Sequence, residues 1–204
     1  MALKCSPMVT LCVSLPQGRG RWIGIAETDE DALLYSCKFM AQKKTPKTNA
    51  MRMLDIAKIP YEIKEYEVDE SDLSGTHIAD QVGLPYDMVF KTIVTKGDKT
   101  GFCVFCLPCH KEIDFKAAAR ASGNKSIEPL HVKDLLGITG YIRGGCSPVG
   151  MKKKFPTYFD SSAGSLDKLT VSAGMKGAQL LVDAKAIVSY TEATLCDIAT
   201  DPVK

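Results

Sequence analysis

Regular spacing of hydrophobic and polar positions begins near residue 45 and continues almost to the C-terminus. Upstream, residues 1–40 hold no apolar period long enough to predict a helix or a pair of strands. Downstream, segments with helical and with alternating spacing follow one another at short intervals. The pattern predicts a leader over residues 1–40, disordered or an added extension, and one folded domain over residues 41–204.

The first predicted helix begins at Thr45, an N-cap residue followed by Pro46 in the first turn. Apolar residues at helical spacing give it one buried face, and Pro60 ends it. Residues 61–63 and 66–68 then alternate in opposite phases, which predicts strands interrupted by a bulge near Glu65.

Later segments predict short helices and short strands in turn. Helices are expected at 74–82, 115–121, 131–136 and 184–189, with Gly83 ending the first and with Asp114 and Asp183 as N-caps of the second and the last. Strands are expected at 88–94, 102–107, 141–143, 157–159, 169–171 and 179–182. This alternation favours an α/β or α+β domain with a mixed sheet that closes partway.

Composition narrows the class of protein. The 204 residues are 45% hydrophobic and 25% charged, which is typical of a globular protein and excludes global disorder and a coiled coil. No apolar run approaches the roughly 20 residues of a membrane span, so no membrane partner is expected. The net charge of +2 argues against DNA binding by charge alone, and any RNA contact must be local. Eight cysteines without a signal peptide indicate reduced thiols and a cytoplasmic location.

The leader has two interpretations. The sequence MAQKKTP at 40–46 resembles the start of a bacterial open reading frame, which favours an extension from an upstream start. A native regulatory or targeting arm is the alternative.

Common catalytic and metal-binding signatures are missing from the sequence. Cys103 and Cys106 have the C-x₂-C spacing of zinc sites, but residues i and i+3 of a strand point to opposite faces. These cysteines are therefore expected to pack in the core, and no metal or cofactor is expected. The three histidines are interpreted as surface or capping residues.

Two features suggest a site for an anion or a carbonyl oxygen. Lys91 interrupts an apolar strand, where it either reaches an edge harmlessly or holds its charge over a cleft. Gly144 and Gly145 begin the sequence GGCSPVG, whose backbone N–H groups can converge on an oxygen. A basic run follows, which is either a solvated face or a contact for an RNA backbone: Lys152, Lys153 and Lys154.

These two features together resemble the YbaK/EbsC family of stand-alone aminoacyl-tRNA deacylases. The resemblance rests on VFKT at 89–92 and GGCSPVGMKK at 144–153, supported by TNA at 48–50, GLP at 83–85 and VSAGMKG at 171–177. It covers about residues 45–199 and leaves the leader without a counterpart. It implies a mixed sheet curled into a partly open barrel with short helices outside.

The resemblance also implies a substrate and a site. Members of the family hydrolyse mischarged tRNA, and the YbaK branch removes cysteine that prolyl-tRNA synthetase has attached to proline tRNA. By matching positions, Lys91 is the essential lysine and Gly144 and Gly145 are the catalytic glycine pair. Substrate-binding positions fall on Tyr66, Thr92, Ser147 and Asp160, and tRNA-binding positions on the lysines at 152–154. An aromatic pocket residue of the YbaK branch falls on Ser74 here, which leaves the preferred amino acid open.

The mechanism that the resemblance implies requires no protein nucleophile. In the YbaK branch the thiol of the substrate cysteine attacks its own ester carbonyl and releases tRNA and a cyclic thiolactone, so the enzyme only orients the ester and stabilises the oxyanion. Cys146, within the glycine-rich loop, is the internal rival. The sequence thus predicts a Cys-tRNA(Pro) deacylase; the alternatives are a deacylase for another mischarged tRNA such as Ala-tRNA(Pro), and a non-catalytic module that binds tRNA or a synthetase.

Overall fold

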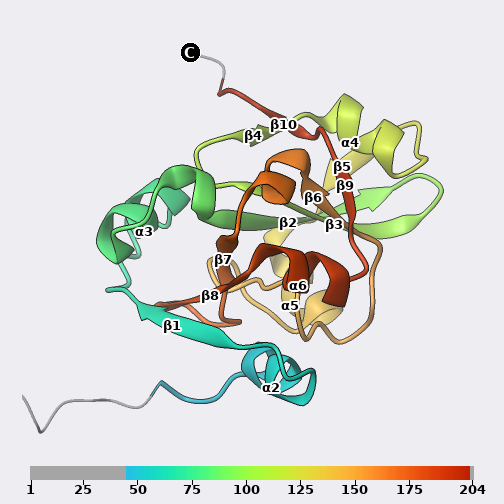
Figure 1. Cartoon of the computed structure of the whole chain (residues 1–204). Coiled ribbons are helices and arrows are strands. Elements are labelled where there is room, and N and C mark those ends of the chain that lie inside the picture. Colours follow the sequence, from blue (N-terminus) through green and yellow to red (C-terminus); the bar gives the residue numbers. More distant parts are fainter. Residues whose placement is uncertain (1–44, 203–204) are drawn as a thin grey trace, which may run out of the picture. The chain divides into compact units, whose positions relative to one another are not determined.

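The computed structural model describes residues 45–202 (Figure 1). The predicted leader lies outside these residues. Within them, no helix is long and apolar enough to cross a membrane.

Helices and strands alternate along the described chain, as the sequence pattern predicts. The helices are α2 (Asn49–Ile56), α3 (Gly75–Val82), α4 (Phe115–Ala121), α5 (Val132–Thr139) and α6 (Ala184–Tyr190), with the short 3₁₀ helices η1 (Tyr86–Met88) and η2 (Ser161–Ser165). The strands are β1 (Tyr61–Glu65), β2 (Phe90–Gly97), β3 (Gly101–Pro108), β4 (Glu112–Ile113), β5 (Ile127–Pro129), β6 (Thr157–Asp160), β7 (Lys168–Ser172), β8 (Ala178–Asp183), β9 (Thr194–Cys196) and β10 (Ala199–Thr200).

The strands form two larger sheets and one small one. One sheet has the order β1-β8-β7 and is antiparallel. The other has the order β5-β2-β3-β6-β9, in which β3, β6 and β9 run parallel and the remaining pairs antiparallel. β10 pairs with β4. The mixed α/β architecture expected from the sequence is confirmed.

The main core packs the inward faces of both sheets together with α2 and α6. Phe90 of β2, Phe159 of β6 and Leu180 of β8 belong to it, and each is at most 2% exposed. A second core lies on the other face of the five-stranded sheet, where Phe105 and Leu107 of β3 pack against α4. Alternate residues of β3 therefore serve different cores, as the period of two of a strand requires.

Four helix ends follow the predicted local chemistry. Ser74 accepts a hydrogen bond from the backbone of His77 at the start of α3, and Gly83 ends that helix in the left-handed conformation with φ +67°. Asp114 and Asp183 cap α4 and α6 in the same way. These caps need only neighbouring residues, which explains why the sequence reveals them.

Three local predictions are wrong because distant segments decide them. Thr48 rather than Thr45 caps α2, and its hydroxyl also donates to the carbonyl of Ala173. No bulge occurs near Glu65: β1 pairs with β8 in continuous register, and the chain then leaves the sheet. Residues 141–143 form no strand, because the ring of Tyr141 is buried and its hydroxyl donates to the carbonyl of Val149.

Cys103 and Cys106 are both fully buried, and they belong to different cores. We expect their replacement by alanine, one at a time, to lower the free energy of unfolding by about 1 kcal/mol through lost packing. Urea titration of each variant measures this change. Stoichiometric zinc or iron in the purified protein would contradict a purely structural role.

Candidate functional site

Lys91 lies near the start of β2, on the face turned away from the main core. It alternates with Phe90 and Thr92, and its half-buried side chain donates from Nζ to the carbonyl oxygen of Cys109 at 3.1 Å. Burial lowers the pKa of the Lys91 ammonium below its usual value, while the nearby Cys109 and Glu112 partly offset this effect. The strand thus holds a poorly solvated cation beside one carbonyl group.

The bridge between the two larger sheets places polar residues on the same face as Lys91. Val89, the residue before β2, pairs in parallel with Thr170 of β7 in an isolated bridge. Two residues further along β7, Ser172 is paired with Gln179 of β8. Thr170, Ser172 and Gln179 alternate with core residues, so they share the face turned away from the main core.

Four side chains among the described residues carry buried polar atoms without hydrogen-bond partners: Tyr66, Thr95, His110 and Gln179. The side-chain oxygen of Gln179, a residue that is 5% exposed, has no hydrogen-bond partner among the described residues. The same holds for the hydroxyl of Tyr66, whose backbone N–H donates to Gly177 at 3.0 Å in the β7–β8 turn. More than nine in ten buried polar groups are normally paired, so these atoms are exceptions that require an explanation.

Sequence reasoning missed Gln179. The available signal was a single amide side chain in strand β8, flanked by the core residues Ala178 and Leu180. That signal alone does not separate a ligand contact from a surface position.

The glycine-rich loop lies against the β7–β8 turn. A Cβ atom on Gly145 would come within 3.0 Å of the carbonyl carbon of Met175, so the loop and the turn pack backbone to backbone. Gly144 has φ +80°, a conformation that side chains other than that of glycine rarely adopt. The Gly145 N–H already donates to the carbonyl of Ile142 at 3.0 Å, whereas the N–H groups of Gly144 and Cys146 have no acceptor among the described residues. The free donors are therefore at 144 and 146 rather than at 144 and 145.

The start of α3 links Lys91 to this loop. A Cβ atom on Gly75 would lie 2.4 Å from Cβ of Cys109, the residue whose carbonyl binds Lys91. A Cβ atom on Gly144 would lie 3.7 Å from the side chain of Leu73, which precedes α3. Figure 1 shows α3 on the side of the domain where β1, β7 and β8 lie. The segment around the start of α3 therefore contacts both the residue that binds Lys91 and the glycine-rich loop. We refer to Lys91, Tyr66, Gln179 and the glycine-rich loop together as the lysine site.

Three of the predicted substrate-binding residues make contacts that favour structural roles. Thr92 faces the main core, where its hydroxyl lies 3.8 Å from the thiol of Cys106. Ser147 is fully buried, and its hydroxyl accepts from the N–H of Val149. The Asp160 carboxylate accepts from the backbone and hydroxyl of the nearby residue 162 and from the backbone N–H groups of residues 198 and 199, so it ties η2 to the C-terminal segment.

The predicted tRNA-binding lysines are all exposed. Lys152 donates to two carbonyls in the last turn of α5, and Lys154 forms an ion pair with Glu192. Lys153 has no ion-pair partner among the described residues. Of the three lysines, Lys153 is thus the one whose ammonium group makes neither an ion pair nor a hydrogen bond among the described residues.

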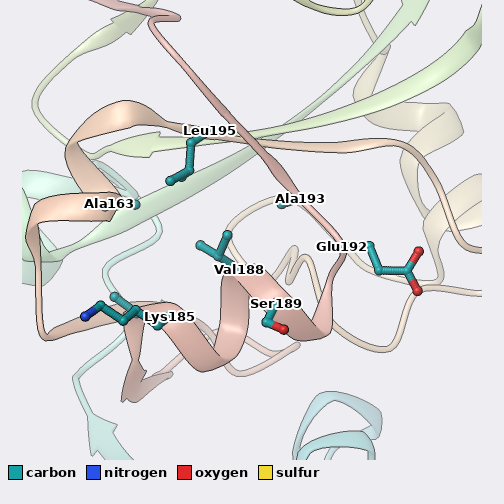
Figure 2. Close-up of a pocket in the computed structure, with 9 residues that line it drawn as sticks. Ala163, Lys185, Val188, Ser189, Glu192, Ala193 and Leu195 are labelled. Carbon is teal, nitrogen blue, oxygen red and sulfur yellow. The ribbon is translucent and has the colours of Figure 1, made fainter.

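A separate groove lies between η2, α6 and β9 and does not include the lysine site. Figure 2 shows Val188 of α6 and Leu195 of β9 directed into it, with Lys185 and Glu192 at its ends. Its lining is mostly apolar and holds neither a histidine nor a cysteine. None of the residues expected to bind substrate or tRNA lines this groove.

The contact between loop and turn can be tested by adding one methyl group. Gly145→Ala would push that group against Met175, so we expect it to displace the loop and lower any activity of the lysine site at least about tenfold. Gly137→Ala in α5 is the matched control: nothing lies within 4 Å of its Cβ position, and alanine favours a helix by about 0.5–1 kcal/mol. Steady-state kinetics and thermal denaturation of both variants measure these effects. Equal activity of the two variants would contradict a role for the loop contact.

Comparisons with known proteins agree in family and in fold. The sequence profile of the aminoacyl-tRNA editing domain matches residues 75–190. EbsC of Enterococcus faecalis, whose name proposes a Cys-tRNA(Pro)/Cys-tRNA(Cys) deacylase, is 48% identical over 162 residues, which cover 79% of this chain and 99% of EbsC. A crystal structure of a proposed trans-editing enzyme for prolyl-tRNA synthetase has a TM-score of 0.68 at 21% identity and covers 76% of this chain and 98% of its own. A scaffold protein used for epitope grafting has the same TM-score at 20% identity, with 78% and 99% covered. At such identities the solved structures establish the fold.

Proposed function

Because the chain belongs to the aminoacyl-tRNA editing domain family, we propose that it is an aminoacyl-tRNA deacylase that removes cysteine from mischarged Cys-tRNA(Pro). The 48% identity to EbsC along nearly the whole length of that relative supports the substrate class. The observation that carries the proposal is the half-buried Lys91 ammonium, held at the carbonyl of Cys109. The loop N–H groups without acceptors and the unpartnered polar atoms of Tyr66 and Gln179 support it.

The site suits stabilisation of an oxyanion. When the ester carbonyl is attacked, its oxygen gains negative charge, and a cation or N–H group fixed nearby stabilises that charge without reorganisation. Lys91 and the N–H groups of Gly144 and Cys146 are the candidates for this role. The side-chain oxygen of Gln179 and the hydroxyl of Tyr66 would bind polar groups of the aminoacyl or ribose moiety.

The nucleophile in this proposal is the substrate's own thiol. Its sulfur bonds to the ester carbonyl carbon, the bond from that carbon to the ribose oxygen breaks, and the ribose oxygen takes up a proton. The products are tRNA and a cyclic thiolactone. Burial raises the pKa of the Cys146 thiol to about 12, which leaves this internal rival protonated at neutral pH. Burial also raises the pKa of Cys109.

The partners and the finer architecture follow as parts of the same proposal. The exposed lysines at 152–154 would contact the tRNA backbone, and prolyl-tRNA synthetase would supply the mischarged tRNA in the cytoplasm.

We also infer that the two larger sheets form a partly open barrel around the main core. The parallel bridge from Val89 to Thr170 supports this inference, since it joins them along one edge.

Deacylation of three charged tRNAs tests the proposed substrate. Proline tRNA carrying cysteine, proline tRNA carrying alanine and cysteine tRNA carrying cysteine should be incubated separately with the protein. We expect cysteinyl-tRNA(Pro) to be cleaved. The rate for cysteine tRNA carrying cysteine shows how far cleavage depends on the tRNA body. Preference for alanine would replace cysteine as the edited amino acid, and binding without cleavage of any of the three would indicate a non-catalytic module.

A further inference from the structure

An ion pair joins the β7–β8 turn to the segment before α3. Nζ of Lys176, in the β7–β8 turn, lies 2.7 Å from both carboxylate oxygens of Glu70, in the segment before α3. The lysine side chain is only 23% exposed, whereas that of Glu70 is 69% exposed. The Lys176 side chain is therefore largely covered by the protein, whereas the Glu70 carboxylate lies on its solvent side.

The stem of Lys176 runs beside the glycine-rich loop. A Cβ atom on Gly144 would lie 3.6 Å from both Cγ and Cε of Lys176. The ammonium group, which is bonded to Cε, therefore lies close to the glycine-rich loop. A nucleic acid that brings an acylated 3′ end to the loop would bring the phosphates of its last nucleotides to the same part of the surface.

Glu70 differs from the other acidic residues of its segment. Asp69 accepts hydrogen bonds from the backbone and hydroxyl of Ser71, and Asp72 accepts from the backbone N–H of Ser74. Both carboxylates therefore stabilise local turns, as short acidic side chains commonly do. Glu70 instead reaches a residue 106 positions away.

We propose that Lys176 binds the phosphate group that joins the last two nucleotides of the acylated RNA, and that Glu70 occupies this phosphate position when no RNA is bound. The proposal rests on the proposed function and adds a binding residue to it. A carboxylate presents two oxygens to an ammonium group, as the non-bridging oxygens of a phosphodiester do. Because Glu70 is largely exposed, its carboxylate returns to water at little cost when the phosphate replaces it.

Two consequences follow from this exchange. The internal ion pair orders the Lys176 side chain before binding, so less rotamer freedom is lost when RNA arrives. It also makes Glu70 a competitor of RNA. Removing Lys176 should therefore weaken binding, and removing the charge of Glu70 should strengthen it only while Lys176 is present.

Kinetics with two substrates test the exchange. Lys176→Ala should raise the KM for Cys-tRNA(Pro) about tenfold with little change in kcat, since one charged contact is lost. It should also lower the slope of log KM against log salt concentration by about 0.7, the value for one phosphate on a single strand. Glu70→Gln should lower the KM about threefold, and should have no effect in the Lys176→Ala background. For cysteinyl-adenosine, an ester that carries no phosphate, neither variant should change the kinetics.

A matched ion pair between the segment before α2 and Asp55 of α2 provides the control. Lys47→Ala and Asp55→Asn remove an exposed pair outside the lysine site, and both variants should retain the parental KM for both substrates. If Lys176→Ala raised the KM equally for the tRNA and for cysteinyl-adenosine, Lys176 would only support the loop. No change on either substrate would also overturn the phosphate assignment.

A binding measurement separates this proposal from the proposed function. Fluorescence anisotropy with uncharged CCA trinucleotide requires no deacylation. We expect Glu70→Gln to bind it more tightly than the parental protein and Lys176→Ala more weakly. If the variants show this order of affinities but the protein cleaves neither substrate, the phosphate site is supported and the deacylase is rejected. If the protein cleaves its substrate but all three proteins bind the trinucleotide equally, the deacylase is supported and the phosphate site is rejected.

Discussion

Replacing Lys91 by alanine should lower kcat for deacylation of Cys-tRNA(Pro) about 10²–10³-fold while the domain stays folded. A preorganised charge at a developing oxyanion contributes about 3–4 kcal/mol to the stability of the transition state, which corresponds to that loss. Lys91 contacts one carbonyl and lies outside the main core, so the fold does not depend on its charge. Single-turnover kinetics and far-UV circular dichroism measure the two effects.

The matched control is Lys96→Ala, on the same strand but exposed. It removes the same charge from β2 without touching the lysine site, and its kcat should equal the parental value. Unfolding of the Lys91 variant would assign Lys91 a structural role, and full activity of the folded variant would place the site elsewhere.

The pH dependence of stability gives Lys91 an independent signature. Burial lowers its pKa in the folded state below the unfolded value, so the protonated form disfavours folding. This destabilisation is fully present below the folded pKa and disappears as pH rises through the unfolded pKa. We therefore expect Lys91→Met to raise the melting temperature at pH 7 and to lose that advantage in strongly alkaline solution. An unchanged melting temperature at pH 7 would show that the ammonium is better solvated than its position indicates.

Cysteinyl-tRNA should be cleaved at least about 10³-fold faster than seryl-tRNA of nearly the same shape. The reason is chemical: a thiol with a pKa near 8.5 is partly ionised at neutral pH, and intramolecular attack gains up to about 7–11 kcal/mol from proximity, whereas a hydroxyl remains protonated. The rate should rise with pH as the substrate thiol ionises and fall again as Lys91 loses its proton. Rapid-quench measurements with both substrates between pH 6 and about pH 10 test this prediction.

The thiols of the protein provide the control for this prediction. Cys146→Ala should keep most of the activity, because the high pKa of that thiol leaves it a poor nucleophile. Alkylation of the substrate thiol should stop the reaction. Equal rates for seryl and cysteinyl substrates, or an acyl group trapped on Cys146, would overturn substrate-assisted cleavage.

Local chemistry was readable from the sequence alone. The ends of α3 and the N-caps Asp114 and Asp183 depend on residues within one turn, so their pattern predicts them correctly. Alternation along β3 likewise separates Cys103 from Cys106 without knowledge of the partner strands. The two motifs at 89–92 and 144–153 identify the family for the same reason, since each is continuous in the chain.

Only the tertiary structure brings the members of the site together. Gln179 joins Lys91 because β2 meets β7 and β7 pairs with β8, which no sequence spacing encodes. The hydrogen bond from the Gly145 N–H to the carbonyl of Ile142 depends on the conformation of the loop. Glu70 and Lys176 meet across 106 residues. Residues that act on one substrate must converge in space, whereas a sequence pattern reports only neighbours along the chain; the sequence therefore determined the elements and the family, and the packing of the two sheets decided which side chains share the site.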